Sequence, residues 1–186
     1  APAATKYRAL LIGQAYSGKP CKLEGTVNDR NAMASVLSKM TATPYTSTLK
    51  TDLTADGIIS AINSTFGSAT SEDVSLFYYS GHGLSSTDAS MLGSLLGYNL
   101  DYITPTTLRT TLDGIAGKKI VIIDACFSGN MIGKSTLEAS VLEDELNEKI
   151  VNSFVSAFAS AGKSNLAASN YYVIVAARSD QSSWEG

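Results

Sequence analysis

The chain has 186 residues, of which 44% are hydrophobic and 17% are charged, and its formal net charge is −3. This much apolar material supports one folded domain with a sizeable core and excludes a wholly disordered chain. The slightly acidic balance argues against binding to nucleic acid or to a membrane surface. No apolar run reaches the about 20 residues of a membrane-spanning helix. With two cysteines and one histidine, neither a disulfide scaffold nor a zinc site is expected.

The two ends of the sequence carry expectations about processing. The chain begins at Ala1 without Met, as either a mature end after signal-peptide removal or a cloning remnant would. Sparse charge together with frequent Ser and Thr slightly favours an exported protein over a cytoplasmic one. The sequence stops at Gly186, soon after an apolar run, so we expect a C-terminal piece of the domain to be missing from this chain.

In chain order, the first part of the sequence alternates strands with helices. A nearly continuous apolar run at 7–13 predicts a strand buried on both faces. Apolar residues at helical spacing follow over 26–40, with Thr26 as the expected N-cap. A weaker strand is expected at 45–50, and Thr54 is expected to cap the next helix.

The second part continues the alternation, which predicts an α/β domain with a mostly parallel central sheet. Three further buried strands are expected at 74–81, 119–125 and 171–177. Thr104 followed by Pro indicates a helix start. A long helix is expected from the capping-box pair Ser135 and Glu138 to about Ala161. The segment 128–170 that contains it is long for a connection between parallel strands, so we expect a surface excursion.

Two of the predicted strands end in residues suited to catalysis, at 80–83 (SGHG) and at 124–126 (DAC). Ligands bind beyond the carboxyl ends of parallel strands, so His82 and Cys126 are expected to face each other if their strands are neighbours. A cysteine thiolate beside an imidazole can act as a nucleophile, and the imidazole can later protonate a leaving amine. The backbone N–H groups of Gly83 and Cys126 are candidate oxyanion-hole donors.

Each of these residues also has a purely structural interpretation. A histidine after a strand is often a hydrogen-bonded loop residue, and a cysteine there is often a small buried apolar side chain. The joint occurrence of His82 and Cys126 at two strand ends, each bracketed by Gly and Ser, favours the catalytic interpretation. The other cysteine, Cys21, lies in a loop and is expected to take no part.

The two motifs together resemble those of the caspase–metacaspase family of cysteine peptidases. YSGHG at 79–83 is similar to the family's histidine motif, and DACFSG at 124–129 is similar to its cysteine motif. His82 and Cys126 are 44 residues apart, which suits the family. LEGTVND at 23–29 resembles the segment that opens the family's first helix.

This resemblance implies a fold and an activity. Residues 1–186 would form a caspase-like α/β/α sandwich, and the family's last strand and helix, which belong to its small subunit, would lie on a separate chain or beyond this one. His82 would be the general base and acid of a cysteine endopeptidase, and Cys126 would be its nucleophile. Its partners would be protein or peptide substrates.

Within the family, the sequence resembles the branch that cleaves after Arg or Lys. Asp29, Ser80 and Asp124 fall where metacaspases place residues of the pocket for a basic side chain. Glu185 stands where caspases carry an arginine that holds aspartate. Other roles stay open: Asp29 as a capping acid of its helix, Asp124 as a residue that orients a loop, Ser80 at a strand end, and Glu185 in solvent.

The resemblance also bears on calcium and on activation. Many metacaspases bind calcium through aspartates after the histidine motif. That region offers only Asp88 and Asp101 here, so we expect no calcium requirement, although calcium stays open as a ligand. Self-cleavage of a zymogen is expected at Lys134 or Lys163, in Gly- and Ser-containing flanks of the 128–170 segment, because such flanks are favoured nicking sites. The alternative, an uncut active chain, stays open.

Three other functions fit parts of the sequence. A clostripain- or gingipain-like peptidase shares the His/Cys layout and the preference for basic residues. A non-catalytic caspase-like scaffold is a second alternative, which retention of both His82 and Cys126 argues against. A receiver-like signalling domain would need an acid at the end of the first strand, where Ile12-Gly13-Gln14 carries none.

Overall fold

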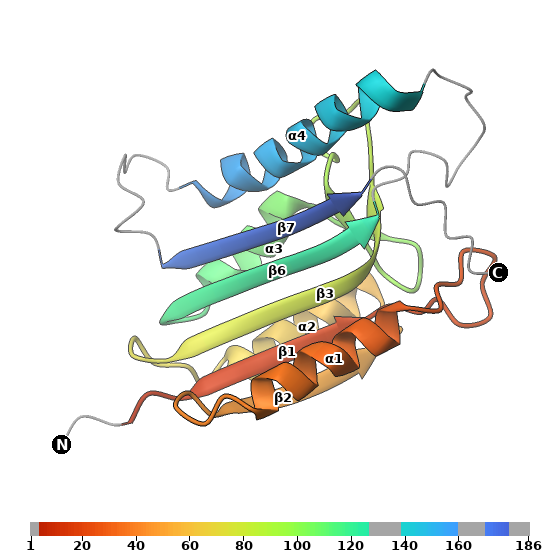
Figure 1. Ribbon diagram of the computed structural model, residues 1–186. Helices are drawn as coiled ribbons and strands as arrows, with labels where there is room; N and C mark the ends of the chain where they lie inside the picture. The colour runs from red at the N-terminus through yellow and green to blue at the C-terminus, as the bar shows by residue number, and fades with distance from the viewer. Residues whose placement is uncertain (1–3, 127–138, 160–169, 179–186) are drawn as a thin grey trace.

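The computed structural model describes residues 4–126, 139–159 and 170–178, which form three layers with a sheet between helices (Figure 1). The described strands are β1 (Tyr7–Gly13), β2 (Tyr45–Thr51), β3 (Val74–Leu84), β4 (Ser94–Leu96), β5 (Tyr102–Ile103), β6 (Lys118–Cys126) and β7 (Tyr171–Arg178). The described helices are α1 (Thr26–Ser38), α2 (Ala55–Phe66), α3 (Pro105–Asp113) and α4 (Ala139–Phe158).

The five long strands pair side by side in the order β2-β1-β3-β6-β7, and every neighbouring pair is parallel. All five therefore end at the same edge of the sheet. The α/β fold with a parallel sheet is confirmed, as are the four strands that the apolar runs predict and the weaker strand expected at 45–50. The strand β7 is not buried on both faces as expected, because Tyr172 and Ile174 are exposed. The sequence did not indicate β4 and β5, which form an antiparallel extension of β3 and are only three and two residues long.

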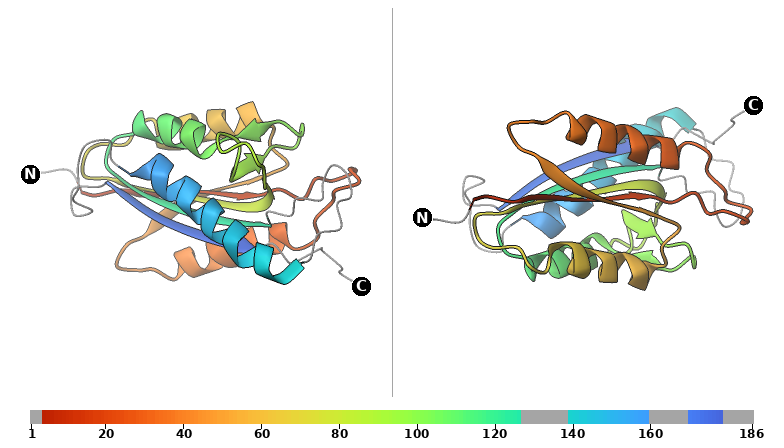
Figure 2. Two further views of the ribbon diagram at one scale, coloured as in Figure 1. Left: turned by 90° about the horizontal axis from the view of Figure 1, so that it is seen from above. Right: turned by 90° about the horizontal axis from the view of Figure 1, so that it is seen from below.

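Helices cover the two faces of the sheet unequally, with α1 on one side and α2 and α3 on the other (Figure 2). The larger hydrophobic core lies on the side of α2, where residues such as Ile58 and Phe66 pack against Phe77 and Tyr79 of β3. A smaller cluster on the side of α1 includes Leu37. None of the helices among the described residues is long and apolar enough to cross a membrane.

The cap expected at Thr54 is confirmed, and so is the helix start predicted at Thr104. The side chain of Thr54 accepts a hydrogen bond from Gly57 at α2, and that of Thr104 does the same for Thr107 at α3. The expectation for Thr26 is wrong, because Gly25 is the N-cap of α1 and no side chain caps that helix. The hydroxyl of Thr26 is buried and instead donates to the Gln14 carbonyl, 3.0 Å away, which ties α1 to the end of β1.

The long helix expected after Cys126 is α4, which connects the parallel strands β6 and β7. Its side chains Ile150, Phe154 and Phe158 are buried in the larger core. This helix is therefore part of the domain core, whereas the sequence suggested a surface position for it. The capping-box pair expected at its start, Ser135 and Glu138, lies outside the described residues.

Candidate active site

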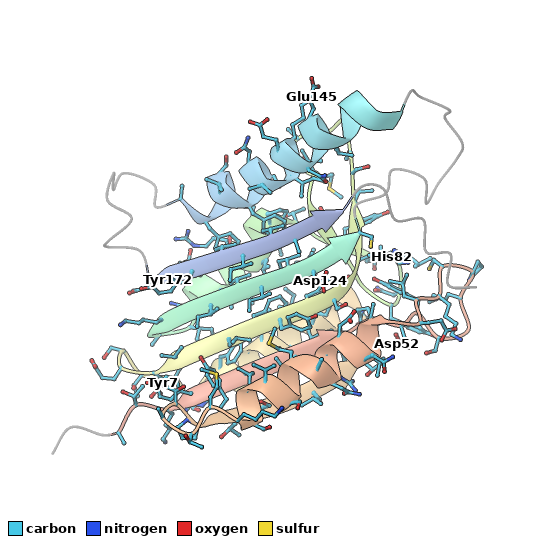
Figure 3. All side chains as sticks on the ribbon, in the orientation of Figure 1. Tyr7, Asp52, His82, Asp124, Glu145 and Tyr172 are labelled. Atoms are coloured by element: carbon cyan, nitrogen blue, oxygen red, sulfur yellow. The ribbon has the colours of Figure 1, made fainter. Side chains whose placement is uncertain are left out.

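The site predicted from the sequence lies where β3 and β6 end. In the parallel register of these strands, Ser80 pairs with Asp124 and His82 pairs with Cys126. Side chains at paired positions of parallel strands point to the same face, and so do residues two apart in one strand. All four side chains therefore project from the α1 face. Figure 3 shows His82 and Asp124 toward the edge of the sheet at which the strands end.

The ring of His82 is held by one backbone carbonyl. Its Nε2 lies 2.8 Å from the carbonyl oxygen of Cys21, in the loop between β1 and α1. A carbonyl oxygen can only accept, so Nε2 carries the proton of this hydrogen bond, and in the neutral ring Nδ1 carries the lone pair. Within the described part of the chain, Nδ1 is buried and has no hydrogen-bond partner. It is the ring atom left to exchange a proton with the paired cysteine.

Burial sets the protonation state of this histidine. Only 7% of the His82 surface is exposed, and desolvation of the charged ring lowers its pKa, partly offset by the hydrogen bond to Cys21, which raises it. The net pKa of His82 lies below its ordinary value. The ring is therefore neutral at neutral pH, which is the state that a general base requires.

Two buried tyrosines, which the sequence did not single out, hold the backbone of His82. The Tyr16 hydroxyl accepts from the backbone N–H of His82 at 3.1 Å, and the Tyr79 hydroxyl donates to its carbonyl at 2.8 Å. The rings of Tyr16 and His82 are also in contact, with centroids 4.8 Å apart. Burial raises the pKa of both phenols well above the ordinary value, so both hydroxyls keep their proton.

The acidic residues predicted for a substrate pocket are brought together beside His82. Ser80 donates from Oγ to Asp29 Oδ2 at 3.2 Å, which joins the end of β3 to the first turn of α1. Asp29 therefore pairs with a strand residue, and no side chain acts as a cap at that helix start. The Asp124 carboxylate accepts from the Tyr78 hydroxyl at 3.3 Å.

Tyr78 connects the two carboxylates electrostatically and is a residue that the sequence did not single out. Burial raises the pKa of its phenol, and the nearby charges of Asp124 and Asp29 raise it further. Both aspartates are exposed to solvent. The result is an anionic patch at the open edge of the sheet, with a neutral phenol against its carboxylates and the His82–Cys126 pair alongside.

The remaining predicted residues divide into described and undescribed ones. Gly83 lies in β3 and pairs with Leu95 of β4, while Cys126 is the last residue of β6. Their role as oxyanion donors stays a prediction. Three residues lie outside the described part of the chain: Glu185, Lys134 and Lys163.

Among the described residues, no cluster of three or more His, Cys, Asp or Glu side chains could hold a metal ion. Of the two aspartates considered for calcium, Asp88 accepts hydrogen bonds from Ser90 in its own loop. Asp101 accepts from the amide of Asn99 at 2.6 Å. That the protein needs no calcium stays a prediction.

Comparison with known proteins gives one family for nearly the whole sequence. A family model described as the caspase domain matches residues 6–186. The chain is 30% identical over 165 residues to Metacaspase-4 of Arabidopsis thaliana. This match covers 76% of the present chain and 40% of Metacaspase-4. The chain thus spans less than half the length of this relative.

Two solved structures are similar in fold, each at 19% sequence identity. A protein from Geobacter sulfurreducens gives a TM-score of 0.57, covering 92% of this chain and 72% of that one. The structure of pro-sf-caspase-1 gives a TM-score of 0.51, covering 74% of this chain and 54% of that one. The arrangement of β3 and β6 is thus found in a chain whose fold is caspase-like.

Proposed function

Since the chain belongs to the caspase-domain family of peptidases, we propose that it is a cysteine endopeptidase with Cys126 as nucleophile and His82 as general base and acid. The observation that carries this proposal is the register of β3 and β6, in which these two residues are direct partners at the carboxyl edge. A second supporting observation is the fixed tautomer of His82, whose Nε2 is bound to a carbonyl while Nδ1 keeps its lone pair.

In the proposed reaction, His82 Nδ1 takes the proton of the Cys126 thiol, and the thiolate attacks the carbonyl carbon of the scissile peptide bond. A C–S bond forms, and the carbonyl π electrons move to the oxygen, which the N–H groups of Gly83 and Cys126 would stabilise. When the intermediate collapses, the C–N bond breaks and Nδ1 returns the proton to the leaving amine. His82 Nδ1 then takes a proton from water, whose oxygen forms a C–O bond with the thioester carbonyl. The C–S bond breaks, the carboxylic acid product leaves, and Nδ1 returns the proton to the Cys126 sulfur.

The proposed substrates carry Arg or Lys before the cleaved bond. Asp29 and Asp124 place two carboxylates beside the reacting pair, and both are open to solvent, as a site for an incoming charged side chain requires. A guanidinium or ammonium group binds carboxylates by charge-assisted hydrogen bonds, whereas an aspartate side chain would be repelled. Glu185 is proposed as a further acid of this pocket.

Activation is proposed to involve self-cleavage at Lys134 or Lys163 and a small subunit, on a separate chain or beyond this one. The proposal rests on the sequence pattern of the 128–170 segment and on the length of Metacaspase-4, of which this chain covers 40%. N-terminal sequencing of fragments from the active protein and from Cys126→Ala tests it. Peptide cleavage by a wild type that remains a single uncut chain would contradict it.

The test of the activity is a cleavage assay of the full-length protein against a peptide library, with and without calcium. Peptidase activity that favours Arg or Lys and disappears in Cys126→Ala is the expected result. A protein that folds and binds library peptides but cleaves none would instead support a caspase-like scaffold. Equal rates with and without calcium would agree with the expectation that the metal is not required.

A further inference from the structure

We propose that Asp52 is a positioning residue for His82, acting through the backbone of the loop between β1 and α1. It lies between β2 and α2, and Figure 3 places Asp52 and His82 toward the same edge of the sheet. The inference rests on the proposed function, because it assigns a residue that supports the general base. Asp52 would contact neither substrate nor the reacting atoms.

The carboxylate of Asp52 binds two successive backbone N–H groups. Its Oδ1 accepts from Tyr16 at 2.7 Å and its Oδ2 accepts from Ser17 at 3.1 Å. Tyr16 has a φ of 51° and Asp52 a φ of 50°, which is a left-handed conformation that few non-glycine residues adopt. Such a backbone aims adjacent N–H groups at one anion. Without the carboxylate, the N–H of the buried Tyr16 would lack an acceptor among the described residues, whereas the N–H of the exposed Ser17 can bind water.

Tyr16 and Ser17, whose N–H groups bind Asp52, belong to the loop that reaches His82. Leu23 donates to the Ala15 carbonyl at 2.9 Å and closes this loop at its base. The carbonyl of Cys21, inside the closed loop, is the acceptor for His82 Nε2. Tyr16 itself contacts the ring of His82 and receives its backbone N–H. Loss of the hydrogen bonds to Asp52 would therefore move both the Cys21 carbonyl and Tyr16, the two groups that orient His82.

Two features make this role testable: Asp52 is charged, and a separate pair of hydrogen bonds, between Gln14 and Leu53, holds the same two segments together. Partial burial raises the pKa of Asp52, but hydrogen bonds from Ser17, Tyr16 and Ala15 lower it more, so the group is anionic at neutral pH. Beside it, the Gln14 side-chain amide bonds to both the N–H and the carbonyl of Leu53. The hydrogen bonds between Gln14 and Leu53 would keep β1 attached to the β2–α2 connection in an Asp52 variant, so we expect the variant to fold.

The consequence for the reaction is the tautomer of His82. If the Cys21 carbonyl leaves Nε2, the neutral ring can carry its proton on either nitrogen. Molecules protonated at Nδ1 cannot take the proton of Cys126. The mixture of tautomers alone lowers kcat only by the fraction of rings protonated at Nδ1. A ring no longer held by the Cys21 carbonyl would also be displaced, and a misplacement of about 1 Å lowers kcat by about 100-fold, while KM should change little.

The test exploits the single histidine of the chain, which gives one unambiguous imidazole signal. Nitrogen-15 NMR spectra are recorded on full-length protein in a Cys126→Ala background, so that no thiol protonates the ring. The expected signature is a pyrrole-like Nε2 and a pyridine-like Nδ1. Asp52→Ala should shift both signals toward a mixture of tautomers, and Asp52→Asn, which keeps one acceptor oxygen, should give a smaller shift.

The matched control is Asp73→Asn. Asp73 also accepts two backbone N–H groups, from Lys6 at 2.8 Å and Thr70 at 2.9 Å, but it lies where β3 begins, at the opposite edge of the sheet. This control should lower the Tm and leave the tautomer of His82 unchanged. In protein that retains Cys126, it should change kcat by less than about twofold.

Two results would overturn the inference: an unchanged tautomer in both Asp52 variants with kcat within twofold of wild type, or an equal change in Asp73→Asn. The second result would mean that general destabilisation, not positioning, moves the histidine. If the wild type cleaved no library peptide, the proposed function would fail. The NMR comparison would still decide whether Asp52 orients His82.

Discussion

The hydroxyl oxygens of Tyr16 and Tyr79 lie 3.0 Å apart, and each binds the backbone of His82. Both rings are completely buried, and both hydroxyls lie 2.8 Å from the carbonyl of Leu96. His82 is thus held at its main chain by one pair of phenols and at its ring by a carbonyl. Removing a phenol oxygen leaves a buried backbone group without its partner.

We therefore expect Tyr79→Phe to lower the free energy of unfolding by about 1–3 kcal/mol, the cost of one unsatisfied buried polar group. Urea denaturation monitored by circular dichroism measures this. The matched control is Tyr172→Phe, because Tyr172 is 61% exposed, and it should change stability by less than about 0.5 kcal/mol. Equal effects of the two substitutions would show that the hydroxyl pair contributes nothing specific.

Cys126 and Cys21 should differ sharply in their response to substitution. Cys126→Ala removes the proposed nucleophile and should reduce peptide cleavage by orders of magnitude. Cys21→Ala keeps the backbone carbonyl that binds His82 and should retain most activity. An electrophile with an arginine group should label Cys126 alone, as mass spectrometry of the digested protein can show. Near wild-type turnover in Cys126→Ala would refute the assignment.

The pH dependence of activity should follow the lowered pKa of His82. Burial disfavours the protonated ring, so the neutral base persists to a pH below the ordinary value of about 6.5. The acidic limb of the kcat/KM profile should therefore have its midpoint below pH 6.5. An NMR titration of the single histidine gives the same quantity directly. A midpoint above 6.5 in both measurements would contradict the role of burial.

The anionic patch should determine the preference for basic substrates. Asp124→Asn should reduce kcat/KM for an Arg peptide by about 10- to 100-fold, less than for a buried ion pair because the carboxylate is exposed. Asp29→Asn should act in the same direction. Glu72→Gln, two residues before β3 and therefore at the opposite edge of the sheet, serves as the charge-matched control. A library profile that favours Asp before the cleaved bond would refute the basic preference.

Stability at low pH should depend on Asp73. Hydrogen bonds from Thr70 and Lys6, together with Arg8, hold the pKa of its carboxyl well below the ordinary value. A lowered folded-state pKa adds stability that is fully present above the unfolded pKa of about 3.9 and is lost as the pH falls through the folded-state pKa. Asp73→Asn should thus be less stable than wild type at pH 7, and the difference in Tm should shrink below about pH 4. A constant difference down to pH 2 would contradict this linkage.

The sequence predicted the parts of the molecule that local pattern controls. Continuous apolar runs correctly indicated the parallel strands, and Thr54 and Thr104 mark helix starts as expected because capping needs only residues three apart. His82 and Cys126 could be placed together because parallel strands end at one edge of the sheet.

What the sequence did not predict depends on contacts between distant residues. Tyr78 reaches Asp124 across 46 positions, and Asp52 reaches Tyr16 across 36. Neither pair has a signature in spacing, since each depends on strand register and loop path. Thr26 matched the pattern of a cap, but burial against the end of β1 gave its hydroxyl another acceptor.

Gly81 links the base and the anionic patch mechanically. A Cβ on this residue would lie 2.6 Å from the Tyr79 hydroxyl and 3.0 Å from a carbon of Gln14, so no side chain fits there without displacing the phenol that holds His82. A substitution at Gly81 would therefore disturb both Ser80, which binds Asp29, and His82, whose carbonyl binds Tyr79. If the proposed function holds, attempts to engineer a new specificity should begin at Asp29 on α1, where the proposed pocket can change while β3, which carries the proposed base, stays intact.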